Sequence, residues 1–365
     1  MERFEHGGNI YEARRRQNGG ETLLDFSANI NPLGLSDRVR EAILEALPHV
    51  VHYPDAKAVA IKAAISGRYG LDAEYAVPGN GAAELLYVLC QMARPSRVLV
   101  TAPSFSEYEK AARAAGAEVE YYYLSPVDDF RINVSEYAEH IPRGGLVFLC
   151  NPNNPTGKIL SRQEVETIVS AAAEREALCL VDESFLDFLP DEETYSVRTL
   201  LDKYPELIIL RSLTKFYAIP GLRLGFLWAN QKVRDMLSKG RDPWNVNTLA
   251  QAAGVAALAD ESYRSASIQT VTEARRQFFD ALNTLPGLKP FPSCANFMLA
   301  DISGTGYRAG DLRKAMLANK VLIRDCSNFP GLSADYIRLA VRSPRENQMV
   351  VEAFRSILCK GSDGC

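Results

Sequence analysis

Short apolar runs that alternate with amphipathic segments constrain the fold of this chain most. Six such runs are rich in branched and aromatic residues, at residues 97–101, 118–124, 146–150, 178–182, 207–211 and 223–228. Most of them are separated by segments with the helical period, such as residues 106–115 and 161–174. Alternating strands and helices predict an α/β fold, a mostly parallel sheet with helices on both faces. In such a sheet, ligands bind at the carboxyl ends of the strands.

The pattern changes after about residue 244, where a long helix over residues 261–285 is expected and a smaller mixed segment follows it. Because 365 residues suffice for about two domains, we predict a large domain over 36–260 and a small α+β domain over 261–365. Residues 1–35 are rich in glycine and asparagine and lack sustained periodicity, so they predict an arm outside the main sheet.

The composition favours small-molecule chemistry. Lysine and arginine total 41 against 45 acidic residues, a net charge of −4, so no basic excess favours nucleic acid or anionic lipid. The sequence contains neither an N-terminal apolar leader nor a run near the roughly 18 apolar residues of a membrane helix. Its seven scattered cysteines, of which Cys359 and Cys365 lie close together, have the spacing of reduced cytoplasmic thiols and predict no metal site.

A turn with the sequence Pro-Gly-Asn-Gly, at residues 78–81, precedes an apolar helical segment at 82–92. Free backbone N–H groups at a helix start, together with the helix dipole, favour an anion such as phosphate. A plain strand-to-helix turn is the alternative. A dinucleotide-binding fingerprint is excluded because Glu84 stands where its third glycine would be.

Three further segments place polar groups near the ends of predicted strands. The sequence Asn-Pro-Asn-Asn-Pro-Thr-Gly at 151–157 follows one strand, and Asp182 ends the next. Asp182 would be poorly solvated there unless a cation faces it, although a helix N-cap is the alternative explanation. Lys215 lies among apolar and small residues in segment 212–225, and such surroundings disfavour its ammonium form, as a nucleophilic lysine requires.

These segments together make the chain similar to the fold-type I pyridoxal-phosphate (PLP) enzymes of the aminotransferase superfamily. Within it, residues 6–9 (His-Gly-Gly-Asn), residues 25–34 and the Lys215 segment most resemble the threonine-phosphate decarboxylases of cobalamin biosynthesis. That resemblance implies decarboxylation of L-threonine O-3-phosphate to (R)-1-aminopropan-2-ol phosphate, with L-serine phosphate as a second candidate substrate.

Two alternatives stay open. Histidinol-phosphate aminotransferases usually have A-N-E-N-P where residues 28–32 read Ala-Asn-Ile-Asn-Pro, and D-E-A-Y where residues 182–185 read Asp-Glu-Ser-Phe. Both differences favour the decarboxylases. A non-catalytic effector-binding protein is the alternative of another class, and it would need an appended DNA-binding domain, for which we expect no room in the short arm.

The resemblance implies a set of residues that bind the cofactor. Lys215 would bond to it covalently and Asp182 would pair with its pyridine nitrogen, which favours the protonated, electron-withdrawing ring. Phe185 replaces the tyrosine that usually contacts the ring oxygen. Asn154 would donate to that oxygen and Phe105 would stack on the ring. The cofactor phosphate would be held by Ser212, Arg223, the N–H groups of Gly81 and Ala82, and Tyr53 from the partner subunit of a homodimer.

A substrate with both a phosphate and a carboxylate needs at least two cationic groups. By resemblance these are Arg324 and Arg338, in strand-like segments where an arginine would otherwise project into solvent. Their allocation between the two anionic groups stays open. The arm would associate with the small domain and act as a lid that excludes water. The resemblance completes the substrate site with His6, Gly7, Asn29 and Asn154.

Overall fold

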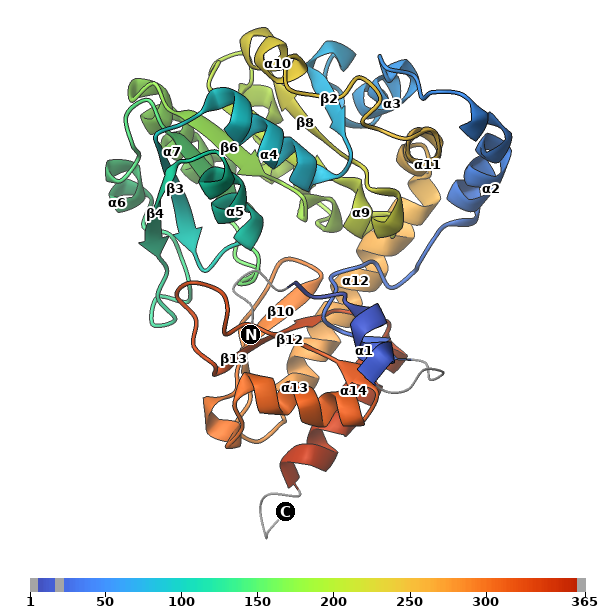
Figure 1. Ribbon diagram of the computed structural model, residues 1–365. Helices are drawn as coiled ribbons and strands as arrows, with labels where there is room; N and C mark the ends of the chain where they lie inside the picture. The colour runs from blue at the N-terminus through green and yellow to red at the C-terminus, as the bar shows by residue number, and fades with distance from the viewer. Residues whose placement is uncertain (1–5, 17–22, 360–365) are drawn as a thin grey trace.

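The computed structural model describes residues 6–16 and 23–359, which form a large lobe and a small lobe (Figure 1). The large lobe is built on a seven-stranded sheet with the order β2-β8-β7-β6-β5-β3-β4. The strand β8 runs antiparallel to both of its neighbours, and the pairs from β7 to β4 are parallel. The strands are β2 (Ala76–Gly79), β3 (Arg97–Ala102), β4 (Glu118–Tyr123), β5 (Leu146–Cys150), β6 (Leu178–Asp182), β7 (Leu207–Ser212) and β8 (Gly225–Ala229).

The six predicted strands are confirmed, with ends shifted by at most two residues, and so is the mostly parallel α/β fold. Their central members are apolar throughout because both faces are covered. In β5, Val147 and Leu149 enter the core on one face while Leu146 and Phe148 enter the core on the other. The strand β2 was not predicted, since it contains a proline and a glycine, which are rare in strands.

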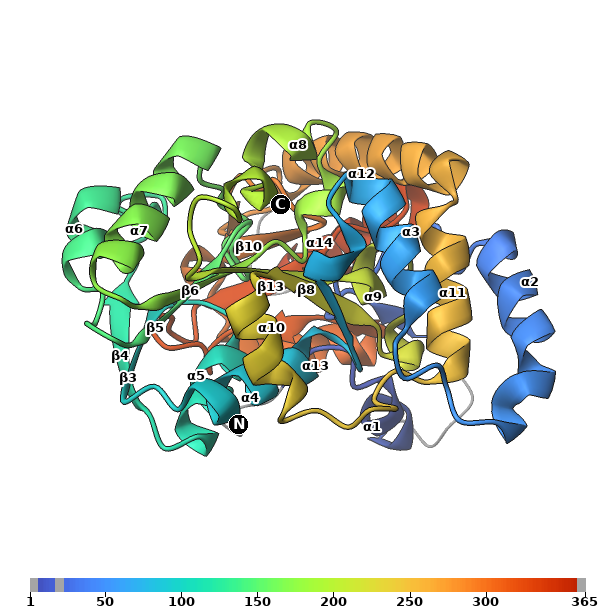
Figure 2. The same cartoon turned by 90° about the horizontal axis from the view of Figure 1, so that it is seen from above.

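Helices cover both faces of this sheet, as Figure 2 shows from above. One face carries α4 (Ala82–Ala93), α5 (Ser106–Ala114) and α10 (Gln231–Ser238). The other carries α3 (Val59–Tyr69), α6 (Val134–Glu139), α7 (Arg162–Glu174) and α11 (Thr248–Leu258), with α2 (Asp37–Ala46) packed against α11. The predicted helix start at Ser161 is confirmed as a capping box with Glu164. The short helices α8 (Glu192–Tyr195) and α9 (Leu213–Phe216) follow β6 and β7.

The small lobe contains an antiparallel sheet of order β12-β13-β10-β9. Two helices, α13 (Ala309–Ala318) and α14 (Pro344–Leu358), pack with it. Its strands are β9 (Lys289–Pro290), β10 (Phe297–Asp301), β12 (Arg324–Asp325) and β13 (Tyr336–Ala340). The arm lies against this lobe in Figure 1 and contributes α1 (Ile10–Arg16) and β1 (Leu24–Asp25), which pairs in parallel with β11 (Val321–Leu322).

The long helix α12 (Glu261–Leu282) belongs to both lobes. Val271 packs into the core of the large lobe, and Phe278 packs into the core of the small lobe, where it contacts Phe26 of the arm. The helix ends three residues before the predicted position, at an Asn283 cap. Because α12 is shared, the division at residue 260 stays a prediction.

None of the helices in residues 6–16 and 23–359 combines the length and the apolar character that crossing a bilayer requires.

A buried ion cluster joins the ends of β6 and β7. Arg211 on β7 is fully buried, and its guanidinium donates to Glu183, Asp187 and Glu192 at distances of 3.0, 3.0 and 2.9 Å. Burial raises the pKa of Glu183, although Arg211 opposes this shift. Arg198 adds a second guanidinium, whose Nη1 lies 3.2 Å from Glu192 Oε2. Three carboxylates and two guanidinium groups are thus held together away from solvent, so each depends on the others.

We expect Arg211→Met to lower the free energy of unfolding by roughly 3–5 kcal/mol, because it leaves the three buried carboxylates without this cation. Urea titration measures the change. The matched control is Arg40→Met, which removes the exposed ion pair with Asp37 and should cost less than about 1 kcal/mol. Equal losses in the two variants would contradict a structural role for the cluster.

Candidate active site

A cavity of about 650 Å³ lies at the carboxyl ends of the sheet strands, between the large lobe, the small lobe and the arm. It is lined by residues that follow β3, β5, β6 and β7, as the parallel topology predicts. The predicted site residues that line it are His6, Gly7, Asn29, Ala82, Phe105, Asn154, Asp182, Ser212, Lys215, Arg223, Arg324 and Arg338.

Asp182 is held in one orientation at the end of β6. Its Oδ1 accepts the backbone N–H of Ser184 at 2.9 Å, and its Oδ2 accepts the hydroxyl of Tyr108 at 2.7 Å. The Tyr108 ring is fixed in turn by stacking on Phe148, with ring centroids 5.0 Å apart. A buried carboxylate with both oxygens engaged is ready to accept one further hydrogen bond without rearrangement.

Lys215 projects from α9, directly after β7, toward Asp182 and Phe185. Its Nζ donates to Ser212 Oγ at 2.9 Å and lies 5.7 Å from the centre of the Phe185 ring. Burial lowers the pKa of Lys215; the Asp182 carboxylate opposes the shift, and Arg223 adds to it. The sequence-based expectation of a disfavoured ammonium form therefore agrees with these surroundings.

The start of α4 forms a cradle next to Arg223. Gly81 has a φ of 81°, a backbone conformation that favours glycine, and a terminal nitrogen of Arg223 lies 2.5 Å from where a Cβ atom on it would be. The Gly81 N–H donates to the Gly79 carbonyl at 2.7 Å, whereas Ala82 and Ala83 begin the helix and line the cavity. A helix start and a guanidinium in contact suit a phosphate.

Arg324 and Arg338 form the opposite wall. They are register partners on β12 and β13, and their exposed fractions are only 4% and 6%. Arg338 donates to Asn154 Oδ1 at 2.6 Å and to the Ser27 carbonyl at 2.7 Å. Burial lowers the pKa of Arg338 to about 10, and Arg324 acts in the same direction. Two buried cations side by side make this wall a place for anionic groups.

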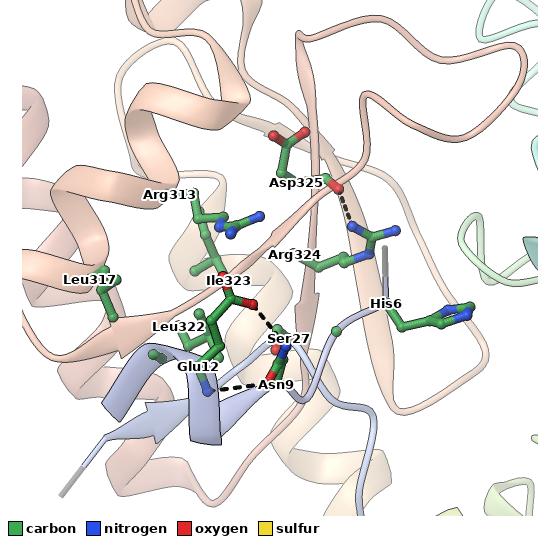
Figure 3. A pocket seen from close by; sticks show the side chains of 12 residues that line it. His6, Asn9, Glu12, Ser27, Arg313, Leu317, Leu322, Ile323, Arg324 and Asp325 are labelled. Atoms are coloured by element: carbon green, nitrogen blue, oxygen red, sulfur yellow. Dashed lines mark hydrogen bonds between the residues drawn. The ribbon is translucent and has the colours of Figure 1, made fainter. Parts of the chain in front are cut away.

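The arm completes the cavity. His6 contacts Glu107, and Gly7 passes so close to Ser27 that a Cβ atom on it would lie 2.0 Å from the Ser27 carbonyl oxygen. A smaller cavity adjoins this region between α1 and β12 (Figure 3), where Arg324 donates to the Asp325 carbonyl at 2.7 Å.

Tyr53 lies elsewhere on this chain. It is 78% exposed and stacks on Trp244, with ring centroids 4.5 Å apart, outside the residues that line the cavity. Its place in a partner's site therefore stays a prediction. Cys359 caps the end of α14, and Cys365 lies outside the described residues.

Sequence reasoning missed several residues that hold the predicted ones in place. Tyr108 could have been suggested, because it lies one helical turn after Phe105 and the two rings meet edge to face. The sequence offers no comparable signal for three others: two have partners more than 100 residues away, and Thr214, two residues from Ser212, stands in no motif that marks the contact. These are Ser27, Glu107 and Thr214, which contact Arg338, His6 and Ser212.

The residues of the cavity fit each functional group of PLP. The start of α4 at Ala82, together with Arg223, suits its phosphate, Asp182 suits its pyridine nitrogen and Lys215 suits its aldehyde. Further polar atoms around the cavity are buried and have no protein partner among the described residues. They are Asn29 Oδ1, Ser184 Oγ and Arg338 Nε. The fold and the site therefore define a PLP-dependent enzyme of fold type I.

The chain belongs to the aminotransferase class I and II family, whose model matches residues 21–354. It is 36% identical to the threonine-phosphate decarboxylase of Salmonella typhimurium, covering 97% of this chain and 96% of that protein. It is 34% identical to the histidinol-phosphate aminotransferase of Symbiobacterium thermophilum, covering 97% and 96%. The solved L-threonine-O-3-phosphate decarboxylase of Porphyromonas gingivalis matches with a TM-score of 0.81 and 29% identity, covering 92% and 99%.

The lowered pKa of Lys215 predicts how the apoprotein takes up PLP. Only the neutral amine attacks an aldehyde, and it predominates above the pKa of the lysine. The rate of uptake, followed by visible absorbance, should therefore rise with pH and reach its midpoint below 10.5, the ordinary lysine value. Acetyl-lysine amide serves as the control amine. A shared midpoint for the protein and this control would show that burial does not tune Lys215.

Proposed function

We propose that the chain is a PLP-dependent carboxy-lyase that converts L-threonine O-3-phosphate to (R)-1-aminopropan-2-ol phosphate, the product that the resemblance assigns to the cobalamin nucleotide loop. The adjacent buried arginines Arg324 and Arg338 carry the proposal, because they match a substrate with two anionic groups. The identity to a threonine-phosphate decarboxylase over nearly the whole length supports it. L-serine phosphate, which lacks only a methyl group, is a second substrate.

When bound, PLP accepts the electron pair of a bond that breaks at the substrate's α carbon. Asp182 would hold a proton at the pyridine nitrogen, and Tyr108 and Ser184 keep its carboxylate aligned for this. Asn154 would donate to the ring oxygen through its amide while its Oδ1 accepts from Arg338. Phe185, in place of a tyrosine, offers no hydroxyl there.

The arginine pair would decide which bond breaks, by orienting the substrate's carboxylate out of the ring plane. A carboxylate loses its charge in decarboxylation, so a tight two-pronged clamp would stabilise the starting state more than the transition state. Both terminal nitrogens of Arg338 already donate to protein oxygens, those of Asn154 and Ser27, which weakens such a clamp. The arm would exclude water from the cavity.

The proposal includes a homodimer in which Tyr53 reaches the partner's phosphate cradle. Several large apolar side chains that are exposed on this chain support it, together with the exposed position of Arg223. Exposed apolar side chains that gather in one patch mark an interface. These side chains are Leu44, Leu47, Val50, Val51, Tyr53, Val59 and Trp244, of which Tyr53 and Trp244 stack on each other. We also propose a cytoplasmic location, which the free thiols of the described cysteines support.

The purified holoenzyme should release carbon dioxide from phosphothreonine and form aminopropanol phosphate. Lys215→Ala should lower the rate by at least about 10³-fold, because it removes the amine that bonds the cofactor and moves protons, and should abolish the borohydride-reducible adduct. Amino transfer from histidinol phosphate to 2-oxoglutarate without carbon dioxide release would instead establish the aminotransferase. An adduct retained in Lys215→Ala would place the covalent bond elsewhere.

A mixing experiment tests the shared site. Tyr53→Ala should weaken PLP binding about tenfold, since a hydrogen bond to a charged group is lost. Co-expression of the Tyr53→Ala and Lys215→Ala chains should give mixed dimers with one site that has both native residues. Activity above the sum of the two variants is therefore expected. The absence of any gain would show that Tyr53 does not complete the partner's site.

A further inference from the structure

Glu107 is an acidic residue where the proposed chemistry calls for cations. It lies on α5, its side chain is only 9% exposed, and it lines the cavity that the substrate's phosphate and carboxylate would enter. An unpaired carboxylate there would repel the substrate. The role of Glu107 therefore depends on the groups that pair with its carboxylate.

Three donors surround this carboxylate. His6 Nε2 lies 2.8 Å from Oε1, the Tyr87 hydroxyl donates to Oε2 at 2.9 Å, and Lys110 Nζ lies 3.6 Å from Oε1. Burial alone would raise the pKa of Glu107, but the hydrogen bonds from His6 and Tyr87 lower it below its ordinary value. Glu107 is thus an anion that is held from two sides.

The ionised state of Glu107 fixes the role of each imidazole nitrogen. A carboxylate can only accept hydrogen bonds, so Nε2 of His6 must carry the proton that it donates. The other ring nitrogen, Nδ1, then remains for a ligand. A fully ionised phosphate also only accepts, so a hydrogen bond to it from Nδ1 needs a proton on that nitrogen as well.

The contact also joins two separate parts of the molecule. His6 belongs to the arm and Glu107 to the large lobe, 101 residues further along the chain. In Figure 3 the His6 side chain points away from Asn9, Glu12 and Ser27, the arm residues beside it. The His6 ring is also placed beside Phe105, with centroids 5.8 Å apart. The arm is therefore tied to the large lobe at the residue that would meet the substrate.

We propose that Glu107 is a positioning residue for phosphate-ester substrates: it acts through His6, holding the arm imidazole in one orientation at the cavity wall, while Tyr87 fixes Glu107. This inference rests on the proposed function, because it takes the substrate to be a phosphate monoester. It names a residue outside the set expected to touch the substrate, and it holds equally for histidinol phosphate.

The test measures binding apart from turnover. Holoenzyme reduced with borohydride is inactive, so calorimetry can report the dissociation constants of phosphothreonine, histidinol phosphate and L-threonine. Glu107→Gln keeps the size and an acceptor oxygen but removes the charge. We expect it to raise the dissociation constants of both phosphate esters about tenfold, the value of a charge-assisted hydrogen bond. The dissociation constant of L-threonine should stay unchanged. With unreduced enzyme, KM should rise and kcat should stay within about twofold.

Three further variants separate positioning from folding. Tyr87→Phe should also weaken the binding of the phosphate esters, but less than Glu107→Gln does, because the contact between Glu107 and His6 remains. The double variant His6→Gln/Glu107→Gln should bind the phosphate esters as weakly as His6→Gln alone, because Glu107 acts through His6. Glu109→Gln is the matched control: it removes a carboxylate of the same helix that pairs with Arg113 at 2.7 Å instead of lining the cavity.

Additive effects of His6→Gln and Glu107→Gln would overturn the proposal, as would equal weakening of L-threonine and the phosphate esters. So would unchanged phosphate-ester binding in Glu107→Gln. These outcomes differ from a failure of the proposed function, which would show as absent carbon dioxide release in the unmodified enzyme while phosphate-ester binding still depends on Glu107.

Discussion

The site depends on one buried guanidinium. Arg211 ties β7 to Glu183, the residue directly after Asp182, and also to Asp187 and Glu192 beyond β6. Asp182 and Ser212 are the last residues of these two neighbouring strands, so the ion cluster fixes the place from which both project. Lys215 follows one helical turn later. The spacing between carboxylate, hydroxyl and amine is thus set beneath the cavity by groups that no substrate reaches.

Hydrogen bonds also fix the arm relative to the site. The Asn31 N–H donates to the Lys215 carbonyl at 3.0 Å, and its side-chain amide donates to the Phe216 carbonyl and to Ser267 on α12, each at 2.7 Å. Phe26 is hydrogen-bonded to the small lobe at Ala340. One stretch of the arm therefore contacts α9, which carries Lys215, the shared helix α12 and the small lobe. A displacement of any one of these elements would displace the others.

The sequence predicted the strands well because burial on both faces leaves a continuous apolar run, as in β5 and β7. The resemblance to a family named the expected cofactor residues, and all of them except Gly81 and Tyr53 line the cavity. The sequence could not predict contacts that depend on the order of strands in the sheet. Tyr108 reaches Asp182 across β5, and His6 reaches Glu107 across 101 residues. The helix and strand within the arm were missed because elements this short have no detectable period.

The facing arginines of β12 and β13 have a consequence for the life of the protein in a cell. Burying Arg324 and Arg338 side by side costs folding free energy, because burial and the like charge of Arg324 both disfavour the charged form of Arg338. A ligand that binds only the folded chain stabilises it in proportion to the logarithm of its concentration. An anionic substrate would then stabilise the folded chain against unfolding and proteolysis.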